Sequence, residues 1–264
     1  MKIFLILFFL LISNSIFSQT SFRLFPEDKI YQKYYADAIS HQFSLQKHFE
    51  SNEWFGNIGT DKPLLNFTIN DNLYQFTIAA TVFNTLKITP PHIQVFTADY
   101  LVDFFLDRNF GNNYILRFNW GHLSAHFSDD GILQLNQTSI NYVRDYVGFG
   151  CEKLLTNLSG KVYLNLKYNF HNEPRKNKHI HGQFGFDIGK TLTSNIIAFI
   201  AFDLKAKAEV NYGTTKNLQL GIRFFNKNDS SVSLAYNYRT GFDERGQLYT
   251  EKDNKNLLGL YIDF

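Results

Sequence analysis

A histidine and a serine two positions apart, His122 and Ser124, form the pair in this chain best suited to chemistry. A serine hydroxyl is a weak nucleophile until a neighbouring general base takes its proton, and an imidazole often serves as that base. A third group orients the imidazole, and Asn141 is the candidate, with Asn136 as a second choice. Such a set can hydrolyse acyl esters if backbone N–H groups or a bound cation stabilise the oxyanion. The predicted catalytic residues are therefore Ser124 as nucleophile, His122 as base and Asn141 as orienter.

Three further polar residues follow closely in the chain. His126, Asp129 and Asp130 cluster just beyond the serine. Carboxylate oxygens are ligands that Ca²⁺ prefers. These three residues are therefore the candidate metal ligands, with Ca²⁺ as the candidate ion, and the sequence indicates no other cofactor.

Strands must position these residues, because the chain alternates between apolar and polar side chains. From Lys161 to His171 the even positions are apolar and the odd positions are mostly polar. Aromatic residues make up 17% of the chain, with 28 Phe and 15 Tyr. A membrane barrel has lipid outside, a polar interior and aromatic girdles, so its strands alternate in this way. The sequence predicts an all-β fold, a twelve-stranded antiparallel transmembrane β-barrel over residues 39–264.

The alternation also gives the direction in which the candidate pair points. In the stretch 114–126 the even positions through Trp120 are apolar, whereas Arg117 lies on the odd, inward face. His122 and Ser124 continue the even row, so they should face outward at the level of the outer leaflet, next to an interfacial tryptophan. The alternative interpretation is a polar edge that bonds to neighbouring strands or to lipopolysaccharide head groups.

Turn signals divide the chain into five short and six longer connections. The longer ones are expected at 51–62, 87–93, 126–139, 172–178, 210–216 and 242–255. Short periplasmic turns and longer external loops are typical of membrane barrels. The last of these loops is charged and is expected to be solvated, with a role for Arg245 in covering the site or binding lipid phosphate as the alternative.

The predicted lumen is crowded with charged and polar side chains, which we expect to pair with one another. On this register the inward residues include Asp99, Asp103, Arg117, Asn119, Arg144, Lys167, His181, Asp187, Lys205, Arg223 and Arg239. A barrel of this size is narrow compared with the porins. A selective pore for a small solute is the functional alternative to a paired network.

The two ends of the chain favour export to a Gram-negative outer membrane. Residues 1–18 read as a secretory signal peptide, with a positive start and a short apolar core. Residues 19–38 are expected to form a periplasmic segment, with a short helix from Lys29 to Ala36 that plugs the barrel mouth or lies against it. The final strand ends on Phe264, a closing aromatic residue that we expect the outer-membrane assembly machinery to bind.

Two resemblances follow from these motifs. The outward His122-x-Ser124 pair followed by an asparagine resembles the site of outer-membrane phospholipase A and the lipid A deacylases. That resemblance implies hydrolysis of acyl esters from the outer leaflet. Most of the chain is also similar to the domain of unknown function 1207 family, in the stretches 98–100, 116–130, 140–142, 201–205 and 241–249. The family has a His-x-Ser-Ser-His-x-Gly-Asp-Glu pattern, from which Ala125, Ser128 and Asp130 depart, and it implies the fold and the location rather than a reaction.

Three classes of function therefore stay open. The first is a lipid acyl hydrolase, the second a non-enzymatic structural or surface barrel, and the third a narrow solute channel. Membrane lipid or lipopolysaccharide is the expected partner of the first. A formal net charge of +2 gives no indication of a nucleic-acid partner.

Overall fold

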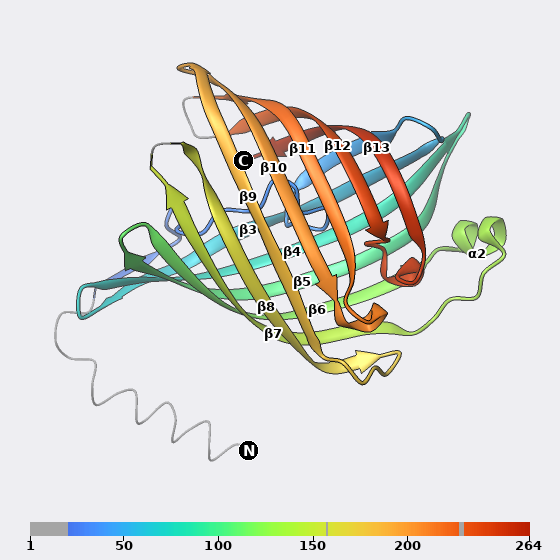
Figure 1. Ribbon diagram of the computed structural model, residues 1–264, viewed down its shortest axis with the longest axis horizontal. Helices are drawn as coiled ribbons and strands as arrows, with labels where there is room; N and C mark the ends of the chain where they lie inside the picture. The colour runs from blue at the N-terminus through green and yellow to red at the C-terminus, as the bar shows by residue number, and fades with distance from the viewer. Residues whose placement is uncertain (1–20, 157, 227–229) are drawn as a thin grey trace.

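Twelve antiparallel strands close into a barrel within residues 21–156, 158–226 and 230–264, which the computed structural model describes (Figure 1). Strands that are consecutive in the chain pair with each other, and β2 also pairs with β13, which closes the ring. The strands are β2 Phe43–His48, β3 Glu53–Ile69, β4 Asn72–Thr89, β5 His92–Gly111, β6 Tyr114–Phe127, β7 Tyr142–Leu155, β8 Ser159–Glu173, β9 Ile180–Thr193, β10 Ile196–Lys207, β11 Gly213–Phe225, β12 Ser231–Phe242 and β13 Lys252–Asp263. The predicted fold class, an antiparallel β-barrel of twelve strands, is confirmed.

Four short elements of the described residues lie outside the ring. They are β1 Phe22–Leu24, α2 Asp129–Leu135, η1 Ala208–Val210 and η2 Gly246–Leu248. Strand β1 pairs with the far end of β3, where Phe22 lies opposite Phe67. In the described part of the chain, no helix has the length and apolar character needed to cross a membrane.

The wall is apolar outside and polar inside, the reverse of a soluble barrel. In β8, Leu164 and Leu166 are 54% and 53% exposed, whereas Tyr163 and Asn165 between them are 1% and 9% exposed. The cause is the period of two along a strand, which sends successive side chains to opposite faces. Exposed leucine, isoleucine, valine and phenylalanine side chains recur around the outer wall. This surface is consistent with a barrel that lies in a membrane.

Two of the predicted long loops are wrong. Residues Glu53–Lys62 belong to β3 and pair with Ile78–Lys87 of β4, and residues Lys87–Ile93 form only a tight turn at Pro90-Pro91. The polar residues of the first stretch resemble a loop in sequence. In the structure, however, Asp61 forms an ion pair with Lys29 (Nζ–Oδ1 2.6 Å), a partner that follows from the fold.

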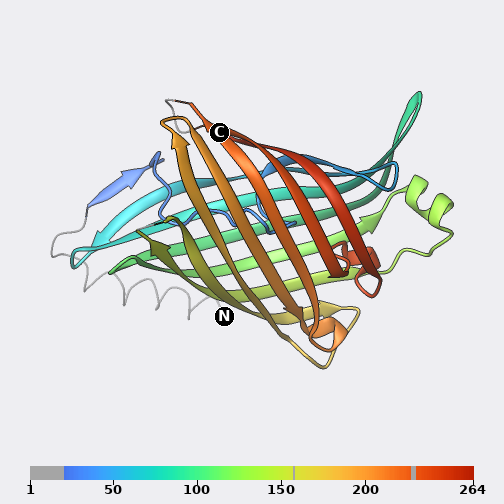
Figure 2. The same cartoon turned by 45° about the horizontal axis from the view of Figure 1, so that its top comes forward.

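The segment before the barrel lies in the lumen (Figure 2). Residues 26–42, called the plug from here on, cross the interior without regular secondary structure, so the helix predicted from Lys29 to Ala36 is not formed. Tyr31 and Ala36 within it are 2% and 0% exposed. The segment was expected at the mouth of the barrel, whereas in the structure it crosses the interior and bonds to the inner wall. The predicted signal peptide, residues 1–18, lies outside the described residues.

Side chains of the wall supply the hydrogen bonds that the plug cannot make within itself. The Lys161 Nζ donates to the carbonyl oxygens of Gln32 and Lys33 at 2.7 and 2.9 Å. The Asn57 Nδ2 donates to two further plug carbonyls at 2.9 and 3.2 Å. Buried backbone groups need such partners. The polar inner wall therefore serves first to hold the plug.

The opposite mouth is closed by residues 243–249 of the β12–β13 connection, called the cap from here on. Every residue of the cap is buried, whereas residues 250–254 of the loop predicted at 242–255 are exposed, so the prediction of a solvated loop is wrong for the cap. The Asp99 carboxylate accepts from the Gly246 backbone N–H at 2.7 Å, and the Gln247 Nε2 donates to the Ile140 carbonyl at 2.8 Å. A Cβ on Gly246 would lie 2.5 Å from Tyr142, so only glycine fits here. The cap folds inward because the wall provides these partners.

Candidate functional site: a His–Asp–His row on the outer wall

The structure places His122 and Ser124 on the outward row of β6. Their neighbours Gly121 and Ala125 are buried, whereas the His122 side chain is 47% exposed. Trp120, one step earlier on the same row, is 52% exposed. The outward direction expected from the alternation is therefore the direction that the structure has.

A carboxylate on the next strand holds His122. Asp145 of β7 lies directly opposite His122 in the β6–β7 register. The Asp145 Oδ1 is 2.6 Å from the His122 Nδ1, a short contact typical of a charged or strongly polarised pair. Directly opposed residues on adjacent strands bring their Cβ atoms about 4.5–5.5 Å apart, which is the distance this contact needs.

The same carboxylate reaches a second imidazole. The Asp145 Oδ2 is 2.7 Å from the Nδ1 of His171 on β8, so one carboxylate bridges two histidines across three adjacent strands. The side chains of Asp145 and His171 are 27% and 51% exposed. The row therefore forms a polar cluster on an otherwise apolar wall.

A β-bulge turns His171 outward. In the β7–β8 register Asp145 pairs with His171 and Tyr146 pairs with Asn169, which leaves Phe170 as the extra residue. The alternation assigned His171 to the inner face, and that assignment is wrong for this reason. Asp145, by contrast, could have been found from the sequence, because it shares the odd, outward row of β7.

The side chain bonded to the His122 Nδ1 in this structure is Asp145 rather than either asparagine. Asn141 precedes the first residue of β7 and is exposed. The other asparagine considered, Asn136, ends helix α2 in a left-handed conformation, with φ 50°. The His122 Nδ1 that an orienter must hold is already bonded to Asp145.

Ser124 lies between Tyr100 of β5 and Val143 of β7 in the sheet register. Among the described residues its hydroxyl has no hydrogen-bond partner within the protein. The next residue of the row, His126, packs edge-on against Tyr100 with ring centroids 5.8 Å apart. Ser124 is thus half-buried between apolar neighbours, with its hydroxyl available to a bound molecule.

The three candidate metal ligands do not converge. His126 is on β6, whereas Asp129 and Asp130 form the first turn of α2, whose N-cap is Ser128. Within the described residues no group of three His, Cys, Asp or Glu side chains could hold a metal ion. The acidic pair lies where carboxylates stabilise a helix N-terminus, so its position has a structural reason.

A family profile matches residues 23–264, and its description is "Protein of unknown function (DUF1207)". The chain belongs to this family. A comparison with curated proteins finds no significant match. In the DUF1207 chain the stretch 241–249 that resembles the family contains the cap, and the stretch 98–100 contains its partner Asp99. Those motifs therefore have a structural role at the closed mouth.

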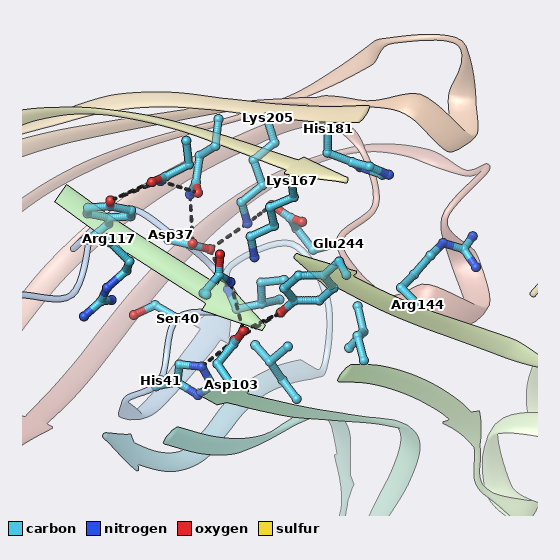
Figure 3. A pocket seen from close by; sticks show the side chains of 18 of the residues that line it. Asp37, Ser40, His41, Asp103, Arg117, Arg144, Lys167, His181, Lys205 and Glu244 are labelled. Carbon is cyan, nitrogen blue, oxygen red and sulfur yellow. Dashed lines mark hydrogen bonds and ion pairs between the residues drawn. The ribbon is translucent and has the colours of Figure 1, made fainter. Parts of the chain in front are cut away.

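The lumen of the DUF1207 barrel holds a second candidate site. A cavity of about 180 Å³ lies between plug, wall and cap (Figure 3). Most of the charges predicted to pair do so, as in the Arg117–Asp107 contact at 2.6 Å and the Arg144–Glu209 contact at 2.8 Å. The interior is thus a network of ion pairs around one remaining space.

Proposed function

We propose that this DUF1207 protein is an outer-membrane barrel that hydrolyses acyl esters of outer-leaflet lipids at the His122–Asp145 row. The observation that supports this most directly is the 2.6 Å contact between the Asp145 carboxylate and the His122 Nδ1. The apolar outer wall supports a position in the membrane. On this reading Ser124 is the nucleophile, His122 the general base and Asp145 the orienting carboxylate.

The contact supports a role for His122 as a general base. A carboxylate that accepts from Nδ1–H keeps the proton on that nitrogen, so the Nε2 carries the lone pair and can take a proton. Alternate residues on a strand are about 6.6–6.8 Å apart at Cα. An imidazole that leans along the strand can therefore bring its Nε2 to the Ser124 hydroxyl.

The reaction would proceed by acyl transfer. The Ser124 Oγ attacks the ester carbonyl carbon while its proton passes to the His122 Nε2. When the tetrahedral intermediate collapses, the C–O bond to the leaving alcohol breaks and His122 returns the proton to that oxygen. Water then hydrolyses the acyl-serine by the same route, with His122 again as base.

The position of the row suits a lipid ester. Trp120 lies next to His122 on the outward row and stacks on Phe104, with ring centroids 5.4 Å apart. Exposed tryptophans in membrane proteins gather at the interface with the head groups. The ester bonds of a lipid lie at this depth, so a substrate could reach Ser124 from the bilayer without entering the lumen.

Lipid hydrolysis by the refolded protein tests the proposal. The protein would be offered phospholipid and lipopolysaccharide with Ca²⁺ or with a chelator, and acyl release measured. Ser124→Ala should reduce release to background, whereas Ser194→Ala in the β9–β10 turn should leave it unchanged. No release from either lipid in any condition would contradict the proposal and favour a structural barrel or a channel.

A further inference from the structure

The turn between β2 and β3 brings a serine, a histidine and a glutamate together, away from the row on the outer wall. The Ser51 Oγ lies 2.5 Å from the His48 Nδ1. The Nε2 of the same imidazole lies 3.1 Å from the Glu50 Oε2, within ion-pair distance. A serine beside a base, with a carboxylate on the other side of that base, is the arrangement that activates a serine hydroxyl.

A neighbouring strand holds this arrangement in place. The Asn256 Nδ2 of β13 donates to the Glu50 Oε1 at 2.7 Å, and the other carboxylate oxygen is the one next to His48. The Phe49 backbone N–H donates to the Asn256 carbonyl at 2.9 Å, and His48 pairs with Leu257 in the β13–β2 register. The His48 side chain is only 10% exposed. The imidazole is therefore fixed by contacts from outside the turn.

The contacts favour one tautomer of His48. An ionised carboxylate accepts hydrogen bonds but does not donate them, so the proton of the imidazole lies on the Nε2 that faces Glu50. The Nδ1 then carries the lone pair and accepts from the Ser51 hydroxyl. The Ser51 Oγ in turn accepts the Glu53 backbone N–H at 3.2 Å. From this protonation pattern an imidazole can take the proton of a serine.

Solvent and a positive charge both reach the serine. Ser51 is partly exposed, and Phe49, Glu50 and Asn52 around it are exposed. The Lys47 Nζ donates to the Ser51 carbonyl oxygen, which places an ammonium group in the same turn. A positive charge held close to an attacked carbonyl stabilises the oxyanion that forms there.

A similar contact in the lumen lacks this access. His41 also lies between a hydroxyl and a carboxylate, those of Thr81 and Asp103, at 2.8 and 2.9 Å. Thr81 and Asp103 are only 3% and 2% exposed, so an ester from solvent would not reach that hydroxyl. The β2–β3 turn combines the same kind of contact with an exposed position.

The position of the turn indicates a substrate that is soluble in water. The turn lies at the same end of the barrel as the cap, because β2 and β12 run in the same direction. The exposed Phe49 ring stacks with Tyr236 of the outer wall, with centroids 6.3 Å apart. Exposed aromatic residues of membrane proteins gather at the interface with water. A turn next to them at the end of the wall therefore faces solvent rather than acyl chains.

We propose that the β2–β3 turn is a further catalytic site, which hydrolyses short-chain, water-soluble esters with Ser51 as nucleophile and His48 as base. The Ser51 Oγ attacks the ester carbonyl carbon, and its proton passes to the His48 Nδ1. The C–O bond to the alcohol then breaks, and His48 returns the proton to the leaving oxygen. Water releases the acid from the acyl-serine by the same route. Glu50 is a positioning residue, because it contacts the imidazole and not the substrate.

Covalent labelling of the refolded protein tests whether Ser51 is activated. A fluorophosphonate reacts with activated serine hydroxyls, and mass spectrometry of peptides identifies the labelled residue. Ser51 should be labelled, whereas Ser194 in the β9–β10 turn, an exposed serine without a histidine partner, should not. His48→Gln should slow labelling of Ser51 by roughly 10²-fold or more. No label on Ser51, or an unchanged rate in a folded His48→Gln protein, would overturn the proposal.

Two further comparisons test the positioning residue and the substrate class. Glu50→Gln should slow labelling by about tenfold or more, and Glu50→Asp should restore part of the rate, because a carboxylate is needed. Equal rates in these two variants would overturn the role of Glu50. Hydrolysis of p-nitrophenyl acetate should be lost in Ser51→Ala and kept in Ser194→Ala, and faster hydrolysis of the palmitate ester would overturn the substrate class. Labels on Ser51 and Ser124 are counted on separate peptides, so this proposal and the outer-wall site can fail independently.

Discussion

Two carboxylates of this barrel hold histidines, one on each face of the wall, and they differ in what they leave unbonded. In the lumen, Asp103 bonds to the His41 Nε2 at 2.9 Å, while the His41 Nδ1 contacts Thr81 at 2.8 Å. Both nitrogens of that imidazole are committed. On the outer wall, Asp145 bonds to the His122 Nδ1, and within the described residues the Nε2 has no protein partner. A histidine with one free nitrogen can transfer protons, whereas one with two bonded nitrogens inside the lumen is a structural tie.

Asp145→Asn should give the largest change in activity. The amide would favour the wrong tautomer of His122, so we expect acyl release to fall by roughly 10³–10⁴-fold. Stability should change by less than about 1 kcal/mol, because the cluster is exposed. The measurement is the rate of lipid hydrolysis beside urea unfolding in micelles. A rate within a few-fold of the unchanged protein would show that Asp145 does not orient a base.

Asp103→Ala should have the converse effect. It leaves His41, Asn119 and the Tyr146 hydroxyl without their acceptor in a buried site, at a cost of about 3 kcal/mol of unfolding free energy. Lipid hydrolysis should persist in the folded fraction, because the outer row is untouched. Urea unfolding followed by circular dichroism measures the loss. Equal stability would mean that the lumenal pairing is dispensable.

Gly246→Ala tests the closed mouth. The new Cβ would lie 2.5 Å from both Tyr142 and Ala125, so the cap must shift, at a cost of about 1–3 kcal/mol. We expect protease cleavage within residues 243–249, which are buried in the unchanged protein. Gly182→Ala in β9 serves as a matched control, because a Cβ there meets nothing within 4 Å and the backbone is not in the left-handed region. Resistance of both variants to protease would contradict a close-packed cap.

Acidic pH should weaken the packing of the cap at the closed mouth of the barrel. Burial raises the pKa of Glu209, but Lys207 and Arg144 outweigh it and lower that pKa to about 2. A depressed carboxylate contributes stability above its unfolded pKa of about 4.3, and this contribution is lost as pH falls toward 2. Protease cleavage of the cap should therefore become faster between pH 5 and pH 2. The increase should correspond to the loss of roughly one ion pair. Glu209→Gln should flatten this dependence, and an unchanged profile would argue against the Glu209 contribution.

The alternation of side chains was enough to predict the barrel. In β8 each side chain faces either lipid or the lumen, and this environment determines whether it is apolar or polar. The period of two is therefore visible in the sequence of the strand. The outward direction of His122 followed from the same rule. His171 did not, because one bulged residue reverses the face of everything after it.

The plug and the cap could not be predicted in the same way. Tyr31 of the plug bonds to Asn165, 134 residues further along the chain, and no local pattern reports such a partner. The charged residues of the cap resemble a solvated loop until Asp243 is seen between Arg245 and Lys255. A polar residue is the same in the sequence whether water or a buried group is its hydrogen-bond partner. Composition alone therefore cannot distinguish these buried segments from solvated loops.

The position of the plug also constrains the order in which the barrel can assemble. The plug precedes every strand of the ring, yet the residues that hold it, such as Lys161 and Lys205, lie in strands β8 and β10. The ring closes only when β13, the last strand, meets β2, which directly follows the plug. The plug is thus covalently joined to the strand at which the ring closes and is held by strands from the middle of the chain, so closing the ring and enclosing the plug depend on the same late contacts.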